Sequence, residues 1–319
     1  MELLIGAPSA VVDVHVDRLR NSPLYARMRP LIERAGCSSE RAQTSGLPPA
    51  PRPTADFDWL MAVTERALVG MRTVDDHNEW LAVLVGAYAE QDAERVLAAV
   101  AQQTGATGAG ARQALGRFAL VGQAEFAASV LDSHLAVVGG QAWVRAALAA
   151  LDNAADQRGA SFAGSSLWRD LSARTSCVDR TLCLVAAADS VATRQLQHGL
   201  NGVGAKALAR ELGTADTALG LSIPDGLDVS FVAQLATPDA AEAARRLLKD
   251  WLWQAGLVIR LAGLPNVLDA AKLEVNANLL QVALAVDAAD LSQYEQRLSD
   301  MLNQSGQGCA ADVAAADVP

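Results

Sequence analysis

The stretch SAVVDVHVDRLRNSPLYARMRPLIERAG, residues 9–36, has a pattern from which the architecture of the chain can be predicted. Val12, Val14 and Val16 alternate with other side chains, which is typical of a half-buried strand. Pro23 suits the first turn of a helix. Apolar residues then recur with helical spacing at Leu24, Met28, Leu31, Ile32 and Ala35. The stretch therefore predicts a strand followed almost at once by an amphipathic helix.

The same strand-to-helix pattern recurs, and the two halves of the chain repeat it in the same order. In the first half we expect strands at 9–17, 65–72, 79–88, 116–122, 125–131 and 134–139, with helices at 22–35, 89–103 and 141–155. In the second half we expect strands at 179–188, 215–222, 227–236, 271–277 and 279–287, with helices at 190–212, 238–262 and 289–304.

This order predicts an α+β fold built by tandem duplication of a β-α-β-β-α-β(-β-α) unit, with mainly antiparallel sheets covered by helices. The unit contains a ferredoxin-like split β-α-β arrangement, which places its helices on one face of the sheet. Either two separate sandwiches or one longer sheet, joined edge to edge, satisfies the pattern. Residues 79–88 are apolar on both sides and are expected inside a sheet, whereas the hairpin 272–286 should have one wet face.

Stretches rich in Pro, Gly and Ser mark the expected domain boundaries. The first repeat spans residues 1–155 and includes a Pro-rich linker at 44–56 and a flexible loop at 105–113; a linker follows at 156–166, the second repeat spans 167–304, and 305–319 form a disordered tail.

The composition narrows the possible partners. The chain has 319 residues, a formal net charge of −10 and 51% hydrophobic residues. An acidic surface repels phosphate backbones, so nucleic acid is excluded, while the apolar content is sufficient for folded cores. No apolar run of about 18 residues occurs, so no transmembrane segment is expected. A protein or an apolar ligand remains as the expected partner, and the oligomeric state stays open.

The first residues, MELLIGAP, lack the basic and apolar regions of a secretory signal peptide. A chain trimmed of its leader and a cytosolic chain both fit such a start. We expect a periplasmic or other extracytoplasmic location if a leader precedes Met1 in the gene, and a cytoplasmic location otherwise.

The four cysteines are Cys37, Cys177, Cys183 and Cys309, and their spacing does not match a zinc site. Four cysteines allow two disulfides with three connectivities. Cys183 lies in the apolar run TLCLVAAA, which favours a small buried side chain instead. The sequence leaves the disulfide state of all four open.

Three short stretches resemble sites of chemistry but fit structural roles better. GATGAG (105–110) follows a predicted helix, whereas a dinucleotide-binding loop follows a strand. GLNGVGAK (199–206) lacks the spacing and the Ser or Thr of a phosphate-binding loop, and is expected to break a helix. DDHNE (75–79) suits a solvated hairpin turn better than a metal site. We therefore assign no catalytic, cofactor-binding or metal-binding residues and expect no cofactor.

Trp251 and Trp253, in KDWLWQAGLVIRLAG, are the candidate interaction residues. Two residues apart on a helix, they point to different sides. The favoured interpretation is that both anchor a core. The functional alternative is a surface that contacts a partner or a lipid, because aromatic residues are enriched at interfaces. The apolar density of this helix predicts that it docks across the junction of the two halves or forms a self-association surface.

The stretch GAPSAVVDVHVDRLRNSPLYARMRPLIERAG resembles the mature start of uncharacterised secreted or lipoprotein-type proteins of high-GC bacteria, the myxobacterial kind especially. HLAVVGGQAWVRAAL and LQVALAVDAADLSQYEQRLSDML are similar to later parts of such chains. The resemblance implies an α+β fold and an envelope location. It implies no activity, and this chain lacks the lipobox cysteine of the group.

These observations predict a non-catalytic binding or structural module, and the resemblance implies that it belongs to the bacterial cell envelope. Two alternatives remain. A carrier of lipid or another small ligand requires an apolar cavity between sheet and helices. An enzyme requires a cleft with converging titratable groups that no motif reveals.

Overall fold

The computed structural model describes residues 8–30, 54–75, 77–104, 110–152 and 166–304. In the first half its elements are β1 (Ala10–His15), α1 (Val16–Arg20), α3 (Ala55–Val63), β2 (Thr64–Val74), β3 (His77–Gly86), the 3₁₀ turn η1 (Glu90–Asp92), α4 (Ala93–Thr104), β4 (Ala111–Leu115), β5 (Phe118–Gln123), β6 (Phe126–Asp132), β7 (Leu135–Gly140) and α5 (Gln141–Asp152).

The second half begins with a short helix and ends with a long one. Its elements are α6 (Ser166–Arg174), the 3₁₀ turn η3 (Cys177–Asp179), β8 (Leu182–Ala186), α7 (Val191–Gly202), α8 (Lys206–Leu212), β9 (Asp216–Ser222), β10 (Leu227–Gln234), α9 (Pro238–Leu261), the 3₁₀ turn η4 (Val267–Ala270), β11 (Lys272–Asn276), β12 (Leu279–Val286) and α10 (Ala288–Gln304).

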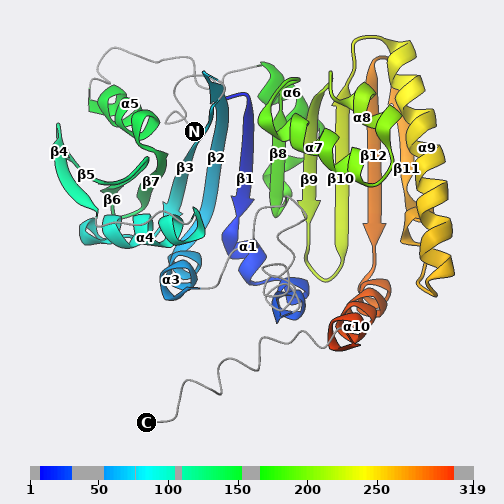
Figure 1. Ribbon diagram of the computed structural model, residues 1–319, viewed down its shortest axis with the longest axis horizontal. Coiled ribbons are helices and arrows are strands. Elements are labelled where there is room, and N and C mark those ends of the chain that lie inside the picture. The colour runs from blue at the N-terminus through cyan, green and yellow to red at the C-terminus, as the bar shows by residue number, and fades with distance from the viewer. Residues whose placement is uncertain (1–7, 31–53, 76, 105–109, 153–165, 305–319) are drawn as a thin grey trace.

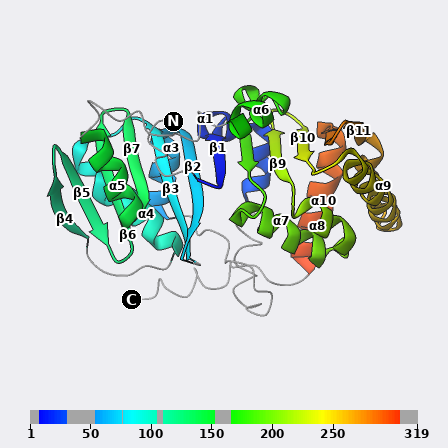
Figure 2. The same cartoon turned by 90° about the horizontal axis from the view of Figure 1, so that it is seen from above.

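All of these strands join one 12-stranded sheet, in the order β11-β12-β10-β9-β8-β1-β2-β3-β7-β6-β5-β4 (Figure 1). Every neighbouring pair is antiparallel. The predicted α+β class with a mainly antiparallel sheet is confirmed. Of the two arrangements left open by the sequence, the chain adopts the longer sheet. Figure 2 shows β4 at one end of the molecule and α9 at the other.

The opening strand β1 forms the junction of the two halves. It pairs with β2 on one side and with β8 on the other, so that Val11 lies beside Gly70 and Val185. Val11 is fully buried. The strand is therefore internal, which is why a single strand-to-helix unit at the start of the chain positions both halves of the sheet.

Helices cover both faces of the sheet. On β3, Leu81 and Val83 belong to the same core as Trp143 of α5, whereas Ala82 and Leu84 belong to the core beneath α4. We call these the α5 face and the α4 face. The expectation of helices on one face is wrong, because apolar residues on both sides of β3 require cover on both.

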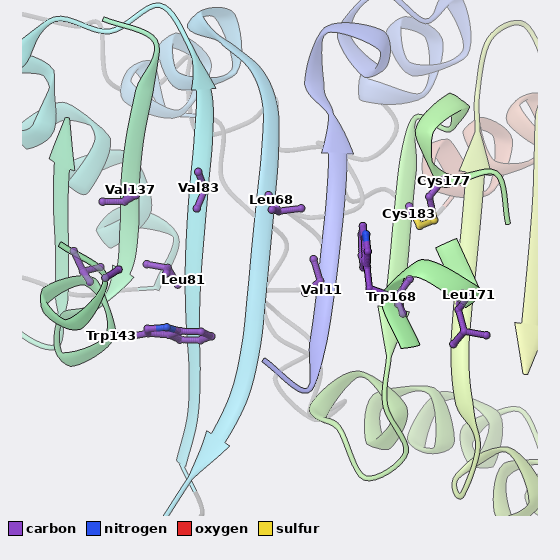
Figure 3. Close-up of a cluster of buried hydrophobic side chains, with 14 of the residues drawn as sticks. Val11, Leu68, Leu81, Val83, Val137, Trp143, Trp168, Leu171, Cys177 and Cys183 are labelled. Atoms are coloured by element: carbon purple, nitrogen blue, oxygen red, sulfur yellow. A yellow bond between two sulfur atoms is a disulfide. The ribbon is translucent and has the colours of Figure 1, made fainter. Parts of the chain in front are cut away.

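On the α5 face, two tryptophans pack over the centre of the sheet. Trp143 comes from α5 and Trp168 from α6, with Val11 of β1 and Leu68 of β2 between them in the view of Figure 3. Trp143 is fully buried and Trp168 nearly so. One continuous core therefore crosses the junction on this face. In the second half the α4 face is covered by α7, α8 and α9, which share a further core with β10 and β12.

Several elements differ from the sequence prediction. α3 begins at Ala55, inside the predicted linker 44–56, and Thr54 caps it by accepting the N–H of Phe57. β4 includes residues 111–113 of the predicted flexible loop. α6 begins at Ser166, the last residue of the predicted linker 156–166. These three elements are short, so tertiary contacts rather than a long apolar period hold them.

Other predictions are confirmed. The helix expected at 190–212 is broken within 199–206, where Gly204 has a φ of +81° between α7 and α8. Asp75 turns between β2 and β3 with a φ of +48°, as expected of a hairpin turn, whereas residues 77–79 of the predicted turn belong to β3. Exposed Lys272, Glu274 and Asn276 give β11 its wet face. The linker residues 44–53 and 156–165 and the tail 305–319 lie outside the described residues.

Candidate functional site

The candidate site is the exposed side of α9. Thr237 caps this helix by accepting the N–H of Ala240, and Pro238 occupies its first turn. Ala241 and Ala244 are fully buried against the second-half core, so small side chains let the helix lie close to the sheet. The helix contacts β11, β12, η4 and α8.

The two tryptophans of α9 have different surroundings. Trp251 is half-buried and packs against the core shared by α8, α9, β10 and β12. Trp253 is 65% exposed. The expectation that they point to different sides is met. The favoured interpretation that both anchor a core holds for Trp251 and is wrong for Trp253.

An apolar stripe follows Trp253 along the same side of the helix. Leu257 and Val258 are exposed, and Leu261 is 80% exposed. Trp253, Leu257 and Leu261 stand at i, i+4 and i+8, so they form one row on the helix surface. We call Trp253, Leu257, Val258 and Leu261 the α9 stripe. A row of this kind is the anchor pattern of a helix that binds in an apolar groove.

The α9 stripe lies at an end of the molecule. α9 packs over β11 and β12 at the edge of the sheet, far along the strand order from the junction of β1 with β8 (Figure 1). The expectation that this helix docks across the junction is wrong, because α9 packs on β11, which is the outermost strand of the sheet.

Charged side chains border the α9 stripe with both signs. Arg246, Lys249 and Asp250 are exposed on the preceding turns. Arg260 lies 3.3 Å from the carboxylate of Asp269. The border is therefore mixed rather than uniformly basic, in a chain with a net charge of −10.

A second feature is a hollow of about 720 Å³ at the ends of strands in the first half of the sheet, where β5 begins, β6 ends and β7 begins. Its walls include Tyr88, Phe118, Leu135 and Leu151, and Arg117 stands among them. We call it the Arg117 hollow. Burial raises the pKa of the Tyr88 hydroxyl, which is 2.8 Å from Thr64 Oγ1. A hydroxyl that stays protonated and is already hydrogen-bonded contributes no charge to this wall.

A third feature is a hollow of about 440 Å³ at the start of β3, lined by His77, Glu79, Trp80, Glu125 and Phe126 among others. The Trp80 and Phe126 rings are 5.7 Å apart between centroids. Arg72 donates to Glu79 at 2.7 and 2.9 Å, so that carboxylate is already paired.

Two of the stretches considered for chemistry have structural roles: residues 199–206 break a helix, and residue 75 turns between β2 and β3. Within the described part of the chain, no group of three or more His, Cys, Asp or Glu residues is placed to hold a metal ion. Residues 105–109 of GATGAG are outside that part. None of the helices in the described ranges combines the length and hydropathy of a membrane-spanning segment.

Cys177 and Cys183 form a disulfide that connects η3 to β8. Both residues are buried in the core of the α5 face. The expectation that Cys183 is a small buried side chain is confirmed, but the residue is also paired, because the 3₁₀ turn η3 brings Cys177 back onto the strand. Cys37 and Cys309 lie outside the described residues. No sequence spacing signals this pair, since a separation of six residues suits many structures.

Comparisons with known proteins add a distant likeness in fold. No family model matches the chain, and no curated protein matches it. The solved structures that resemble it include crystal forms I and III of TP0453. The match to form I covers 93% of this chain and 96% of the TP0453 chain, at 12% identity and a TM-score of 0.48. Form III covers 92% and 95%, at 12% identity and a TM-score of 0.46. These values are too low for the likeness to bear on function.

Proposed function

We propose that this protein is a non-catalytic binding module of the bacterial cell envelope, and that the α9 stripe is its contact surface. The observation that carries the proposal is a row of three large apolar side chains, Trp253, Leu257 and Leu261, exposed on a helix whose opposite side is anchored in the core. Contiguous apolar surface at one place on a folded domain marks an interaction site.

The chemistry of the surroundings favours a protein partner with an apolar groove. A helix presents i, i+4 and i+8 anchors to such a groove, and Trp is enriched among the residues that dominate binding energy. An anionic lipid surface attracts basic segments. The mixed border of the α9 stripe and the chain's charge of −10 make a lipid surface the weaker fit.

A capture experiment with matched variants tests this function. Trp253→Ala/Leu261→Ala removes most of the α9 stripe, while Val203→Ala removes an exposed apolar side chain at the end of α7. The partner isolated from native envelope extract, once purified, should bind the unaltered protein and Val203→Ala equally, and the double variant at least tenfold more weakly. Equal binding by all three rejects the α9 stripe as the contact surface. Loss of vesicle binding, rather than protein binding, in the double variant assigns the surface to lipid.

We also propose that the two halves arose by tandem duplication. Outward from the junction, both halves present strands in the same order: β1, β2, β3, β7, β6 and β8, β9, β10, β12, β11. In each half, a residue that follows the first strand also forms a hydrogen bond to the other half. After β1, Ser22 donates to the carbonyl of Ile223 beyond β9, and after β8, Arg194 donates to Thr73 near the end of β2 at 3.0 Å.

The halves differ in two respects that a duplication must accommodate. The β4–β5 hairpin occurs only in the first half of the described sheet. α5 packs on β3, β6 and β7, whereas the hydroxyl of Tyr294 in α10 donates to the carbonyl of Pro265, near η4. Superposition of residues 10–152 on 182–304 in a crystal structure of the protein tests the proposal. A different strand order there would exclude it.

The envelope location rests on the Cys177–Cys183 disulfide and on the resemblance to secreted bacterial chains. Disulfides persist in oxidising compartments and are rare in the cytosol. Rapid alkylation of protein in native cells, followed by mass spectrometry, should find the pair oxidised in the periplasmic fraction. A fully reduced pair in the cytosolic fraction would reject this location.

A further inference from the structure

The Arg117 hollow lies where the cores of the two sheet faces meet. Phe118, Leu135 and Leu151 belong to or pack against the core of the α5 face. Tyr88 and Val130 belong to the core of the α4 face. All five side chains line the same space. The hollow therefore lies at the ends of the strands, between the two faces of the sheet, rather than on one face. Its volume of about 720 Å³ is in the range of small-molecule sites.

The apolar wall is held by the fold. Phe118, Val130 and Tyr88 are buried, and the strands that carry Phe118 and Val130 are hydrogen-bonded within the sheet. Leu135 and Leu151 are half-buried and complete the wall from β7 and α5. An apolar body that entered the hollow would replace water against a preformed surface.

Arg117 supplies a cation directly above this wall. Its guanidinium stands 4.9 Å over the centroid of the Phe118 ring. The nearest described carboxylate oxygen, of Asp152, lies 3.9 Å from its Nε, beyond the length of a hydrogen bond. The side chain is 68% exposed. Its N–H groups are therefore positioned over the ring and retain capacity for an acceptor on a ligand.

Two carboxylates elsewhere on the rim restrict the negative charge that the ligand's head group can carry. Glu90 of η1 and Asp132 of β6 both line the hollow. Asp132 Oδ1 accepts the backbone N–H of His134 at 2.7 Å, which holds its carboxylate at the rim. These carboxylates repel a head group with two negative charges more strongly than one with a single charge, so they favour a monoanion at Arg117.

We propose that the Arg117 hollow binds a single-chain amphiphile, with its monoanionic head group on Arg117 and its apolar chain against Phe118, Leu135 and Leu151. This site is independent of the α9 stripe. The same chemistry occurs in a free fatty acid and in a single-chain anionic phospholipid, so both are needed as probes.

Titration calorimetry below the critical micelle concentrations tests the site. The probes are dodecanoate, a lysophosphatidylglycerol and, as a cation of similar chain length, dodecyltrimethylammonium. Arg117→Gln removes the charge, and Arg112→Gln does the same at an exposed position of β4 outside the hollow. Ser133→Trp fills the hollow with a large side chain from an exposed turn. The backbone carbonyl of residue 133, which accepts the N–H of Tyr88, is retained in this variant. Circular dichroism confirms that each variant is folded.

We expect saturable binding of an anionic probe, with one site per chain. Arg117→Gln should weaken it about tenfold or more, because a charged hydrogen bond is lost. Arg112→Gln should leave it unchanged and Ser133→Trp should abolish it. The tighter of the two anionic probes identifies the source. No saturable binding of either probe, equal affinity in Arg117→Gln, or equal binding of the cationic probe would overturn the proposal.

Discussion

Arg66 on β2 donates through Nε and Nη2 to the two carboxylate oxygens of Asp13 on β1. Asp13 is 2% exposed and lies on the α5 face, where its strand also pairs with β8. Hydrogen bonding to this carboxylate raises the pKa of the Arg66 guanidinium above its usual value. The pair therefore neutralises a buried charge at the junction of the two halves.

Removing the cation alone should destabilise the protein strongly. Arg66→Met leaves the Asp13 carboxylate buried and unpaired, which should lower the free energy of unfolding by roughly 3 kcal/mol. The estimate is at the low end for such pairs because the Arg66 side chain is 41% exposed. Urea unfolding measures it. Arg112→Met, which breaks an exposed pair with Glu94, should cost less than about 1 kcal/mol. Equal costs would contradict this role for Asp13.

The disulfide should contribute measurably to stability. Cys177 and Cys183 close a loop of only six residues' separation, so the restriction of the unfolded chain is modest, about 2 kcal/mol. Reductant should lower the melting temperature of the unaltered protein. It should leave unchanged the melting temperature of Cys177→Ala/Cys183→Ala when Cys37 and Cys309 are also replaced. An unaltered protein that is insensitive to reductant would show that the bond contributes nothing.

The two tryptophans of α9 should respond differently to truncation. Trp251→Ala removes a half-buried side chain from the second-half core and should cost about 2–3 kcal/mol, below the range for a fully buried ring. Trp253→Ala should change the free energy of unfolding by less than about 0.5 kcal/mol. Guanidinium unfolding followed by circular dichroism compares them directly. A large loss in Trp253→Ala would mean that its ring supports the fold and is not reserved for a partner.

Acid should weaken the junction through His15. Burial is the main cause that lowers the pKa of this imidazole below 6.5, and the charge of Arg18 lowers it further. Its buried Nε2 has no hydrogen-bond partner among the described residues. The unfolded chain therefore binds a proton more readily than the folded one, so stability should fall as the pH drops below about 6.5.

Melting temperatures measured from pH 7.5 to 5 test this. His15→Gln should reduce the fall, while His134→Gln, in an exposed turn, should not change it. The opposite sign, with stability rising as the pH falls through this window, would rule out the neutral imidazole as the favoured form.

The order of most elements, and the first residue of one helix, follow from local patterns in the sequence. Alternation at Val12 and Val14 predicted β1, and the helix expected at 238–262 begins at the residue where α9 begins. The glycines of residues 199–206 predicted the break before α8. These features depend on local preferences for hydrogen bonding, φ and apolar spacing, which neighbouring residues carry in the chain.

The contacts between these elements do not follow from local patterns, because they depend on residues that are far apart in the chain. The pairing of Val11 with Val185 depends on two strand edges far apart in the sequence, and apolar alternation does not identify which edge a strand selects. The same holds for Trp251 and Trp253, since both fit a core until the packing of α9 at the sheet edge exposes one. The Arg117 hollow likewise has no sequence signal, because its wall combines side chains from three strands and a helix whose proximity arises only when the sheet forms.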